Sequence, residues 1–174
     1  MSLTLYDALV PNWLQILGSV SQLVDKADAA CAGEEYYEGD ILEARLIEDM
    51  LPFAYQVKSC WVHSALALES CKTGHFSPHM APAPDSLGGL RDLIVQAING
   101  LEAWDAEELN AIAGNDMVFT IGDKLRMEFT VQNFLFGFSQ PNLFFHAATT
   151  YNLLRMHGLQ IGKRDFLGAL PLKG

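Results

Sequence analysis

Apolar residues recur every three or four positions through most of the chain, the spacing that places them on one face of an α-helix. In the first such segment Pro11 either kinks a helix or begins its main part, and Gly33 fits its end. A second helix is predicted over residues 41–72, where Pro52 interrupts the pattern and indicates a bend or break near Asp49. The residues expected to face the core are Trp13, Leu17, Val20, Val24, Ala27 and Cys31 in the first helix, and Leu42, Leu46, Met50, Phe53, Val57, Cys60, Ser64, Ala67 and Cys71 in the second.

The middle of the chain alternates between irregular and regular patterns. Residues 74–86 contain three prolines and are expected to form a loop, at whose end Asp85 or Ser86 caps a third helix. Over residues 117–129 apolar and polar residues alternate on both sides of a glycine-containing turn, which predicts a β-hairpin. Because an isolated hairpin is only marginally stable, it is expected to pack against the helices. The third helix is expected to bury Leu87, Leu90, Ile94, Ala97, Leu101 and Trp104.

A last helical segment follows the hairpin. Thr130 can cap it, Pro141 either kinks it or divides it into two helices in series, and Gly158 closes it. Four long amphipathic segments, with a small hairpin before the last, predict an all-α fold, an antiparallel four-helix bundle, as a single domain over residues 1–174. The last helix is expected to bury Phe138, Phe145, Thr149, Leu153 and Met156, and the tail is expected to pack back through Ile161, Phe166 and Leu167.

Composition narrows the classes of function. Half of the 174 residues are hydrophobic and 18% are charged, as in an ordinary folded domain. The net charge of −10 disfavours nucleic acid and anionic membrane surfaces as partners. No apolar run reaches the roughly 20 residues that span a bilayer, and no signal peptide is recognisable, so the cytoplasm is the expected location. The three cysteines, Cys31, Cys60 and Cys71, are expected to be reduced, buried thiols.

The strongest candidate for a site lies in the last helix. Asn142 and His146 are four residues apart, so they share one helix face, among large apolar side chains. An imidazole and an amide on an apolar face need partners, which are hydrogen bonds or a metal ion. The chain contains none of the motifs G-x-S-x-G, H-E-x-x-H, C-x-x-C and G-x-G-x-x-G, nor a P-loop.

Four stretches of the chain resemble a bacterial family of unknown function within the DinB/YfiT-like superfamily. They read L-Y-D-A-L-V-P-N-W-L-Q-I-L-G, R-L-I-E-D-M-L-P-F-A-Y-Q-V, Q-P-N-L-F-F-H-A-A-T-T-Y-N-L-L-R-M-H-G and, as the ending of the subfamily, I-G-K-R-D-F-L-G. The resemblance implies a DinB-like four-helix bundle that is often a homodimer. For many members it also implies a divalent metal, held by one histidine of the second helix and two in an H-x-x-x-H motif of the fourth. Some of these members are thiol-dependent transferases or related enzymes.

This chain departs from that histidine pattern. Matched on the last helix, His146 takes the place of the second histidine of H-x-x-x-H, and Asn142 takes the place of the first. In the second helix no histidine stands at the matching place. Gln56 is the nearest polar candidate there, and His63 lies nearly two turns further on. Because an amide is a weak ligand for zinc or nickel beside an imidazole, no tightly held cofactor is expected.

Three interpretations of this site are open. His146 and Asn142 can form a buried hydrogen-bonded pair, completed by Gln56, Tyr55 or Tyr151, in a structural or binding homodimer. They can line a metal-free pocket for a small molecule, with His146 as an acid or base. They can hold a divalent metal, Zn or Ni, through His146, Asn142 and Gln56, in a transferase or hydrolase.

The remaining basic groups have simpler interpretations. His75 and His79 are also four apart, but they lie in the proline-rich loop, where helical spacing has no meaning, and they are expected to be solvated. Lys163 and Arg164 are expected to pair with Asp165 or with acids of a neighbouring helix.

Overall fold

The computed structural model describes residues 3–173, and its longest element is the helix α1 (Leu5–Ala32). The Thr4 hydroxyl accepts from the Asp7 amide, and the Asp7 carboxylate accepts from the Thr4 amide, a reciprocal cap that fixes where the helix begins. The helix runs through Pro11, so this proline neither starts it nor ends it. Its fully buried residues include the expected Trp13, Leu17, Val20, Val24 and Ala27.

The second helical segment is divided more sharply than its pattern predicts. A short helix, α2 (Glu38–Leu42), is followed by a loop, and α3 (Phe53–Trp61) begins only after Pro52. Beyond α3 the backbone passes through a π-helical turn, η1 (Val62–Leu66), into α4 (Ala67–Ser70) without leaving helical geometry. The interruption expected near Asp49 is therefore a complete break over residues 43–52, and the part after it is one composite helix.

The loop before Pro52 has a structure of its own. The Arg45 guanidinium donates to the Met50 carbonyl at 2.6 Å, which ties the two ends of this loop together. Leu46, expected to face the core, is 42% exposed because it lies in this loop and not on a helix. The expectation of a core position at Leu46 was wrong because the interruption at Pro52 reaches about ten residues back.

The third segment contains α5 (Leu87–Glu102) and the short α6 (Ala106–Ala111). The Ser86 hydroxyl accepts from the Gly89 amide, so Ser86 is the N-cap of α5, and the Asp105 carboxylate caps α6. The six residues expected to face the core are all buried.

A small sheet lies at one end of the helices. The predicted hairpin is present as β2 (Asp116–Ile121) paired antiparallel with β3 (Leu125–Thr130). A third strand, β1 (His75–Phe76), pairs in parallel with β2 and was not predicted, because two residues before a proline-rich stretch carry no periodic signal. Phe76 anchors this strand, since its ring is 1% exposed and stacks on Phe119.

The last helical segment is continuous. It comprises α7 (Val131–Phe134), a second π-helical turn, η2 (Leu135–Ser139), and α8 (Gln140–Met156). The Thr130 hydroxyl accepts from the amide three residues later, as a cap should. Pro141 is tolerated inside this helix because the π-turn directly before it has already displaced the regular hydrogen-bond ladder.

The π-turn also changes which face of α8 is buried. Thr149 and Leu153 are buried as predicted, but Phe145 is 54% exposed and Met156 is 53% exposed. A π-turn inserts an extra residue into the helix, so it rotates the face that the following residues present to the core. The predicted stripe, drawn with a constant helical period, was therefore wrong at these two positions.

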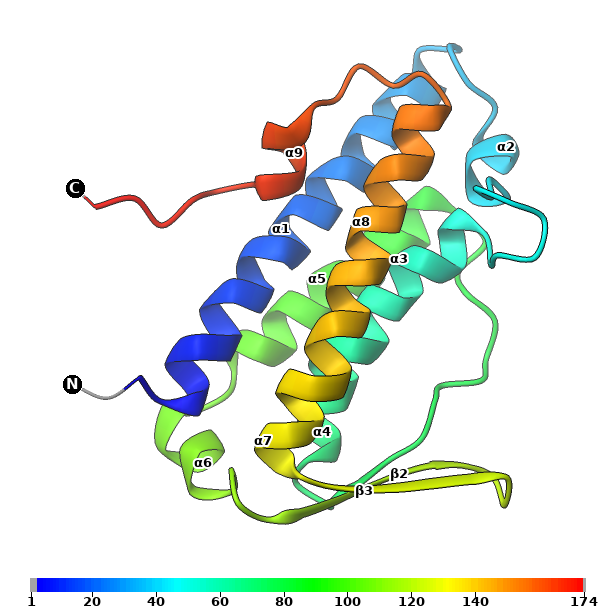
Figure 1. Cartoon of the computed structure of the whole chain (residues 1–174). Helices are drawn as coiled ribbons and strands as arrows, with labels where there is room; N and C mark the ends of the chain where they lie inside the picture. Colours follow the sequence, from blue (N-terminus) through cyan, green and yellow to red (C-terminus); the bar gives the residue numbers. More distant parts are fainter. Residues whose placement is uncertain (1–2, 174) are drawn as a thin grey trace.

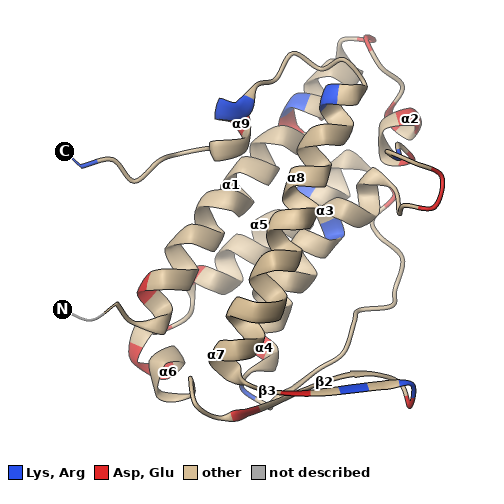
Figure 2. Cartoon of the chain, in the orientation of Figure 1, with Lys and Arg blue, Asp and Glu red and all other residues tan. Residues whose placement is uncertain are grey.

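The long helices lie side by side, as Figure 1 shows. α1 packs against α5 and α8, and α3 packs against the same two helices. The hairpin crosses one end of these helices, and α9 (Lys163–Leu167) lies against α1 towards the other. Figure 2 shows charged residues on α3, in the loop after α2, in the hairpin and near the ends of several helices, while the middle of α8 carries none. Among residues 3–173 no helix has the length and apolarity to cross a bilayer.

Candidate ligand-binding site

His146 is held by Gln56, which reaches across from α3 to α8. The His146 Nδ1 lies 2.7 Å from the Gln56 Oε1, and the Gln56 amide nitrogen donates to the Leu51 carbonyl at 2.7 Å. An amide oxygen only accepts, so His146 Nδ1 must carry the proton and donate it. The neutral ring then has its lone pair on Nε2. Gln56, 2% exposed, thus fixes both the orientation and the tautomer of the imidazole.

Asn142 does not pair with His146 in the described part of the chain. Its side-chain nitrogen donates to the Phe138 carbonyl one turn earlier, at 2.7 Å. The amide of Asn142 therefore bonds to the backbone of its own helix. Tyr151, another suggested partner, packs on Phe166 of α9 with ring centroids 5.9 Å apart. The hydrogen-bonded group is therefore His146, Gln56 and Leu51.

His63 is the residue that the sequence reasoning set aside and the structure brings to the site. Its ring lies parallel to that of His146, with centroids 5.6 Å apart and planes within 11°. Its Nδ1 is buried and has no hydrogen-bond partner among residues 3–173. The signal that could have found it is its spacing from Gln56: seven residues are close to two helical turns, so both side chains face α8.

The two histidines line a cavity of about 190 Å³ between α3, η1, the segment after β1, β2 and the last helical segment. We call it the histidine chamber. Asn142 contributes to its wall, although it does not contact His146 through a hydrogen bond. The residues that line the chamber are Tyr55, Lys58, Ser59, Val62, His63, Pro78, His79, Phe119, Phe138, Asn142 and His146.

Lys58 fastens the proline-rich segment over this chamber. Its side chain is on α3 and only 3% exposed, and its ammonium donates to the carbonyls of His79, at 2.7 Å, and Ala81. The His79 ring is exposed, as expected, and stands edge-on to Trp61 with centroids 5.0 Å apart. Burial lowers the pKa of Lys58. The loop predicted to be merely solvated is thus attached by a buried cation and forms one wall of the site.

Both chamber imidazoles are neutral at pH 7. Burial lowers the pKa of His63 to about 3, with a further contribution from the neighbouring His146, and burial lowers the pKa of His146 to about 4. A neutral imidazole has one N–H donor and one lone-pair acceptor. The chamber therefore presents hydrogen-bonding groups of both kinds beside the single buried cation of Lys58.

The residues present do not match a three-histidine metal site. Gln56 Oε1 and His146 Nδ1 are hydrogen-bonded to each other, so they are not available to share an ion. In residues 3–173 no group of three or more His, Cys, Asp or Glu side chains is arranged to hold a metal. His63 and His146 supply two imidazoles, and the third strong donor of a closed site is replaced by the amide of Asn142.

Other groups singled out in the sequence lie apart from the chamber. Burial raises the pKa of Cys60, and it raises that of Cys71 to about 12, so these thiols are inert core residues. Asp165 is paired with Lys26 of α1 at 2.5 Å. Lys163 and Arg164 take part in none of the ion pairs among residues 3–173, so neither pairing expected for them is formed.

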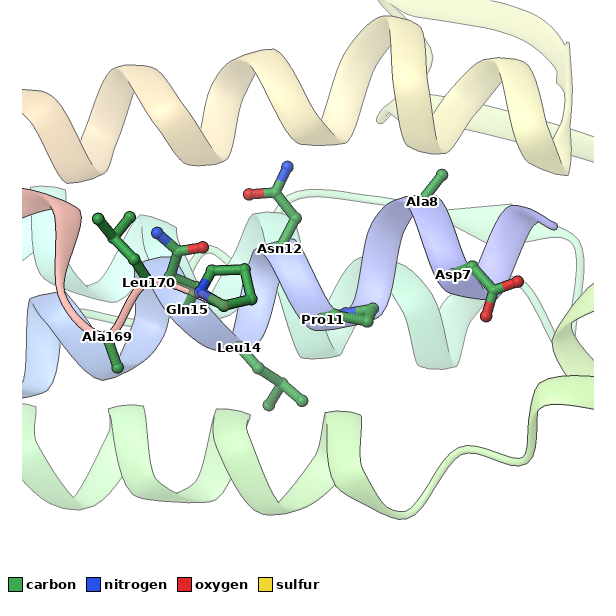
Figure 3. Close-up of a pocket in the computed structure, with 9 residues that line it drawn as sticks. Asp7, Ala8, Pro11, Asn12, Leu14, Gln15, Ala169 and Leu170 are labelled. Atoms are coloured by element: carbon green, nitrogen blue, oxygen red, sulfur yellow. The ribbon is translucent and has the colours of Figure 1, made fainter. Parts of the chain in front are cut away.

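A larger hollow of about 820 Å³ lies along α1 beside the C-terminal tail (Figure 3). The side chains that line it fan out around the helix; Asn12 and Leu14 point to opposite sides in the view. Asp7 is its one titratable lining residue, and that carboxylate belongs to the cap of α1. The hollow therefore brings no cluster of titratable side chains together, in contrast to the histidine chamber.

Comparisons with known proteins agree on the fold. The profile of a family described as a domain of unknown function, DUF1993, matches residues 5–167. A crystal structure of a DinB family member protein from Shewanella denitrificans superposes with a TM-score of 0.82 at 26% sequence identity, covering 98% of this chain and 95% of that one. No curated protein matches the chain. The DinB-like fold expected from the sequence is thereby confirmed.

Proposed function

Because the chain belongs to the DUF1993 family of domains of unknown function and has a DinB-like fold, we propose that it is a small-molecule-binding protein whose ligand occupies the histidine chamber. The observation that carries this proposal is the stacked pair of neutral imidazoles on the wall of a cavity. One of these rings, His63, has a buried nitrogen without a partner among residues 3–173. An unsatisfied buried polar atom costs roughly 1–3 kcal/mol, and a fold that carries this cost beside a cavity is typical of a binding site.

The size of the chamber limits its ligand. A volume of about 190 Å³ corresponds to roughly six water molecules at about 30 Å³ each, which is smaller than a drug-sized pocket. A ligand of roughly six to ten non-hydrogen atoms fits this space. His146 Nε2, with its lone pair fixed by the bond from Nδ1 to Gln56, accepts a hydrogen bond or a proton from such a ligand.

The finer features of the fold and assembly are part of the same proposal. We propose that the long helices form the antiparallel four-helix bundle of DinB proteins, that the ending I-G-K-R-D-F-L-G marks the subfamily, and that the protein is a homodimer. Phe145 and Met156, three turns apart on α8 and each about half exposed, supply apolar surface for a helix-to-helix contact. Light scattering is expected to give twice the 19.2 kDa chain mass for the wild type and the single chain mass for Met156→Asp. A monomeric wild type contradicts the dimer.

The alternative function is a divalent-metal-dependent transferase or hydrolase. One observation favours it, the second imidazole that His63 places beside His146. Two imidazoles and an amide remain a weaker donor set than three histidines. Elemental analysis of protein purified without a metal-affinity tag separates the two: stoichiometric zinc or nickel, lost in His146→Ala, supports the enzyme and counts against the metal-free chamber.

Binding in the chamber is tested by ligand-observed NMR. A panel of neutral, cationic and anionic fragments of up to about ten non-hydrogen atoms is screened against the wild type and two matched variants. Asn142→Leu replaces the amide on the chamber wall by a larger apolar side chain, and Asn152→Leu makes the same change at an exposed site of the same helix. We expect fragments that bind the wild type and Asn152→Leu but not Asn142→Leu, with circular dichroism showing all three folded. A panel without binders, or binders indifferent to Asn142→Leu, overturns the proposal.

A further inference from the structure

We infer that the ligand of the histidine chamber is a small organic anion, a carboxylate carried on a short apolar body. This inference rests on the proposed function and adds the chemical class of the ligand. It starts from the charge of the wall: Lys58 is the one Lys or Arg among the lining residues, and none of the chain's 21 Asp and Glu residues lines the chamber. In a protein of net charge −10, such a wall is a local exception.

Lys58 is the centre of this exception, because it is a buried cation without an anionic partner. Its ammonium is held by two backbone carbonyls, those of His79 and Ala81, and takes part in none of the ion pairs among residues 3–173. A lysine has three N–H donors, so one remains after these two bonds. A buried charge is stabilised when an opposite charge joins it, and here that charge has to come from outside the chain.

The neighbouring groups suit a carboxylate. Asn142 uses one of its two amide hydrogens on the Phe138 carbonyl, which leaves the second for an acceptor. The Ser59 hydroxyl belongs to the same chamber. Charge-assisted hydrogen bonds from an ammonium to a carboxylate are about twice as strong as neutral ones. The chamber therefore offers an anionic acceptor the third N–H of the Lys58 ammonium, the second Asn142 amide hydrogen and the Ser59 hydroxyl.

The rest of the wall favours an apolar body over an inorganic ion. Val62, Phe119 and Phe138 line the chamber on three different elements, η1, β2 and η2. Pro78, in the proline-rich segment that Lys58 holds in place, adds a fourth apolar side chain to the wall. Inorganic phosphate leaves these surfaces uncovered, whereas an aromatic or short aliphatic acid covers them. Benzoate, with nine non-hydrogen atoms, has the size that the chamber volume permits.

The test compares three probes on the full-length protein by calorimetry or NMR titration: benzoate, its neutral isostere benzamide, and inorganic phosphate. Benzoate is expected to bind at least about tenfold more tightly than either of the others. Lys58→Met, which keeps an unbranched side chain one atom shorter and removes the charge, is expected to abolish this preference. Lys124→Met, the same change of net charge at the exposed hairpin turn, is expected to leave it intact.

The outcomes separate this inference from the proposed function. If benzamide binds as tightly as benzoate, or if the preference for benzoate survives in Lys58→Met, the inference that the ligand is an anion is wrong. The proposal that the chamber binds a small molecule is unaffected by that result. If phosphate binds more tightly than benzoate, the inference that the ligand carries an apolar body is wrong. If none of the probes binds, the inference is wrong, and the fragment panel judges the chamber itself. If Lys58→Met does not fold, the wild-type preference for benzoate and its weakening by salt decide the matter.

Discussion

Replacing Gln56 by leucine tests whether this side chain holds His146 in place. The substitution keeps the volume close to that of glutamine and removes two hydrogen bonds, one to the Leu51 carbonyl and one to His146 Nδ1. The bond to the Leu51 carbonyl is partly replaced by a bond to water, because Leu51 is 48% exposed. The bond to His146 Nδ1 is not replaced, because Gln56 is 2% exposed and the leucine at its place offers no acceptor. An orphaned buried donor costs roughly 1–3 kcal/mol, so we expect a loss of about 2 kcal/mol.

That loss has two independent readouts. For a chain of this size 1 kcal/mol shifts the Tm by roughly 2–4 °C, so Gln56→Leu is expected to melt roughly 4–8 °C below the wild type. The ¹⁵N spectrum of the His146 ring is expected to show the Nδ1–H tautomer in the wild type and a mixture of tautomers in the variant. Gln132→Leu, at an exposed position of α7, is the control and is expected to change neither. A Gln56→Leu variant with wild-type stability and an unchanged ring spectrum refutes the reasoning.

Three further predictions concern pH, helix capping and thiols. Burial lowers the pKa of His63 to about 3 and that of His146 to about 4, so below about pH 6.5 the unfolded chain takes up protons that the folded chain refuses. The free energy of unfolding should fall by about 1.4 kcal/mol per pH unit and ring between pH 6 and pH 4; equal urea midpoints at pH 7 and pH 5 contradict this. Thr4→Ala should cost about 1 kcal/mol in urea denaturation through the lost cap of α1, and no change in midpoint speaks against that cap. Cys60 and Cys71 should react with a thiol reagent only after unfolding, because burial raises the pKa of both; rapid labelling of either of these two thiols in the native protein, located by peptide mass spectrometry, shows otherwise.

The helical elements follow from local patterns where the helical period is regular. The third helix is the clearest case, since Ser86 caps it and every residue of its expected stripe is buried. The predictions failed where the backbone departs from that period. The loop before Pro52 exposes Leu46, and the π-turn before Pro141 moves Phe145 out of the core. The spacing of apolar residues does not indicate where a π-turn will form, because a π-turn depends on how the whole helix packs.

The candidate site was accessible to sequence reasoning only in part. The sequence singled out His146, and it offered Gln56 as the polar group nearest to the place of a missing histidine. It gave no reason to include Lys58, whose role depends on carbonyls about twenty residues away in a loop without periodicity. His63 was discounted because it was compared with a motif position; its helical register relative to Gln56 points to the same face.

The most direct test of the chamber is to watch its two rings while a ligand binds. The ¹⁵N and ¹H signals of the His63 and His146 side chains are recorded during titration with each fragment that the panel selects. The account predicts that both rings shift together and saturate, while the exposed ring of His75 stays unchanged. Saturating ligand that leaves both chamber rings unmoved contradicts it.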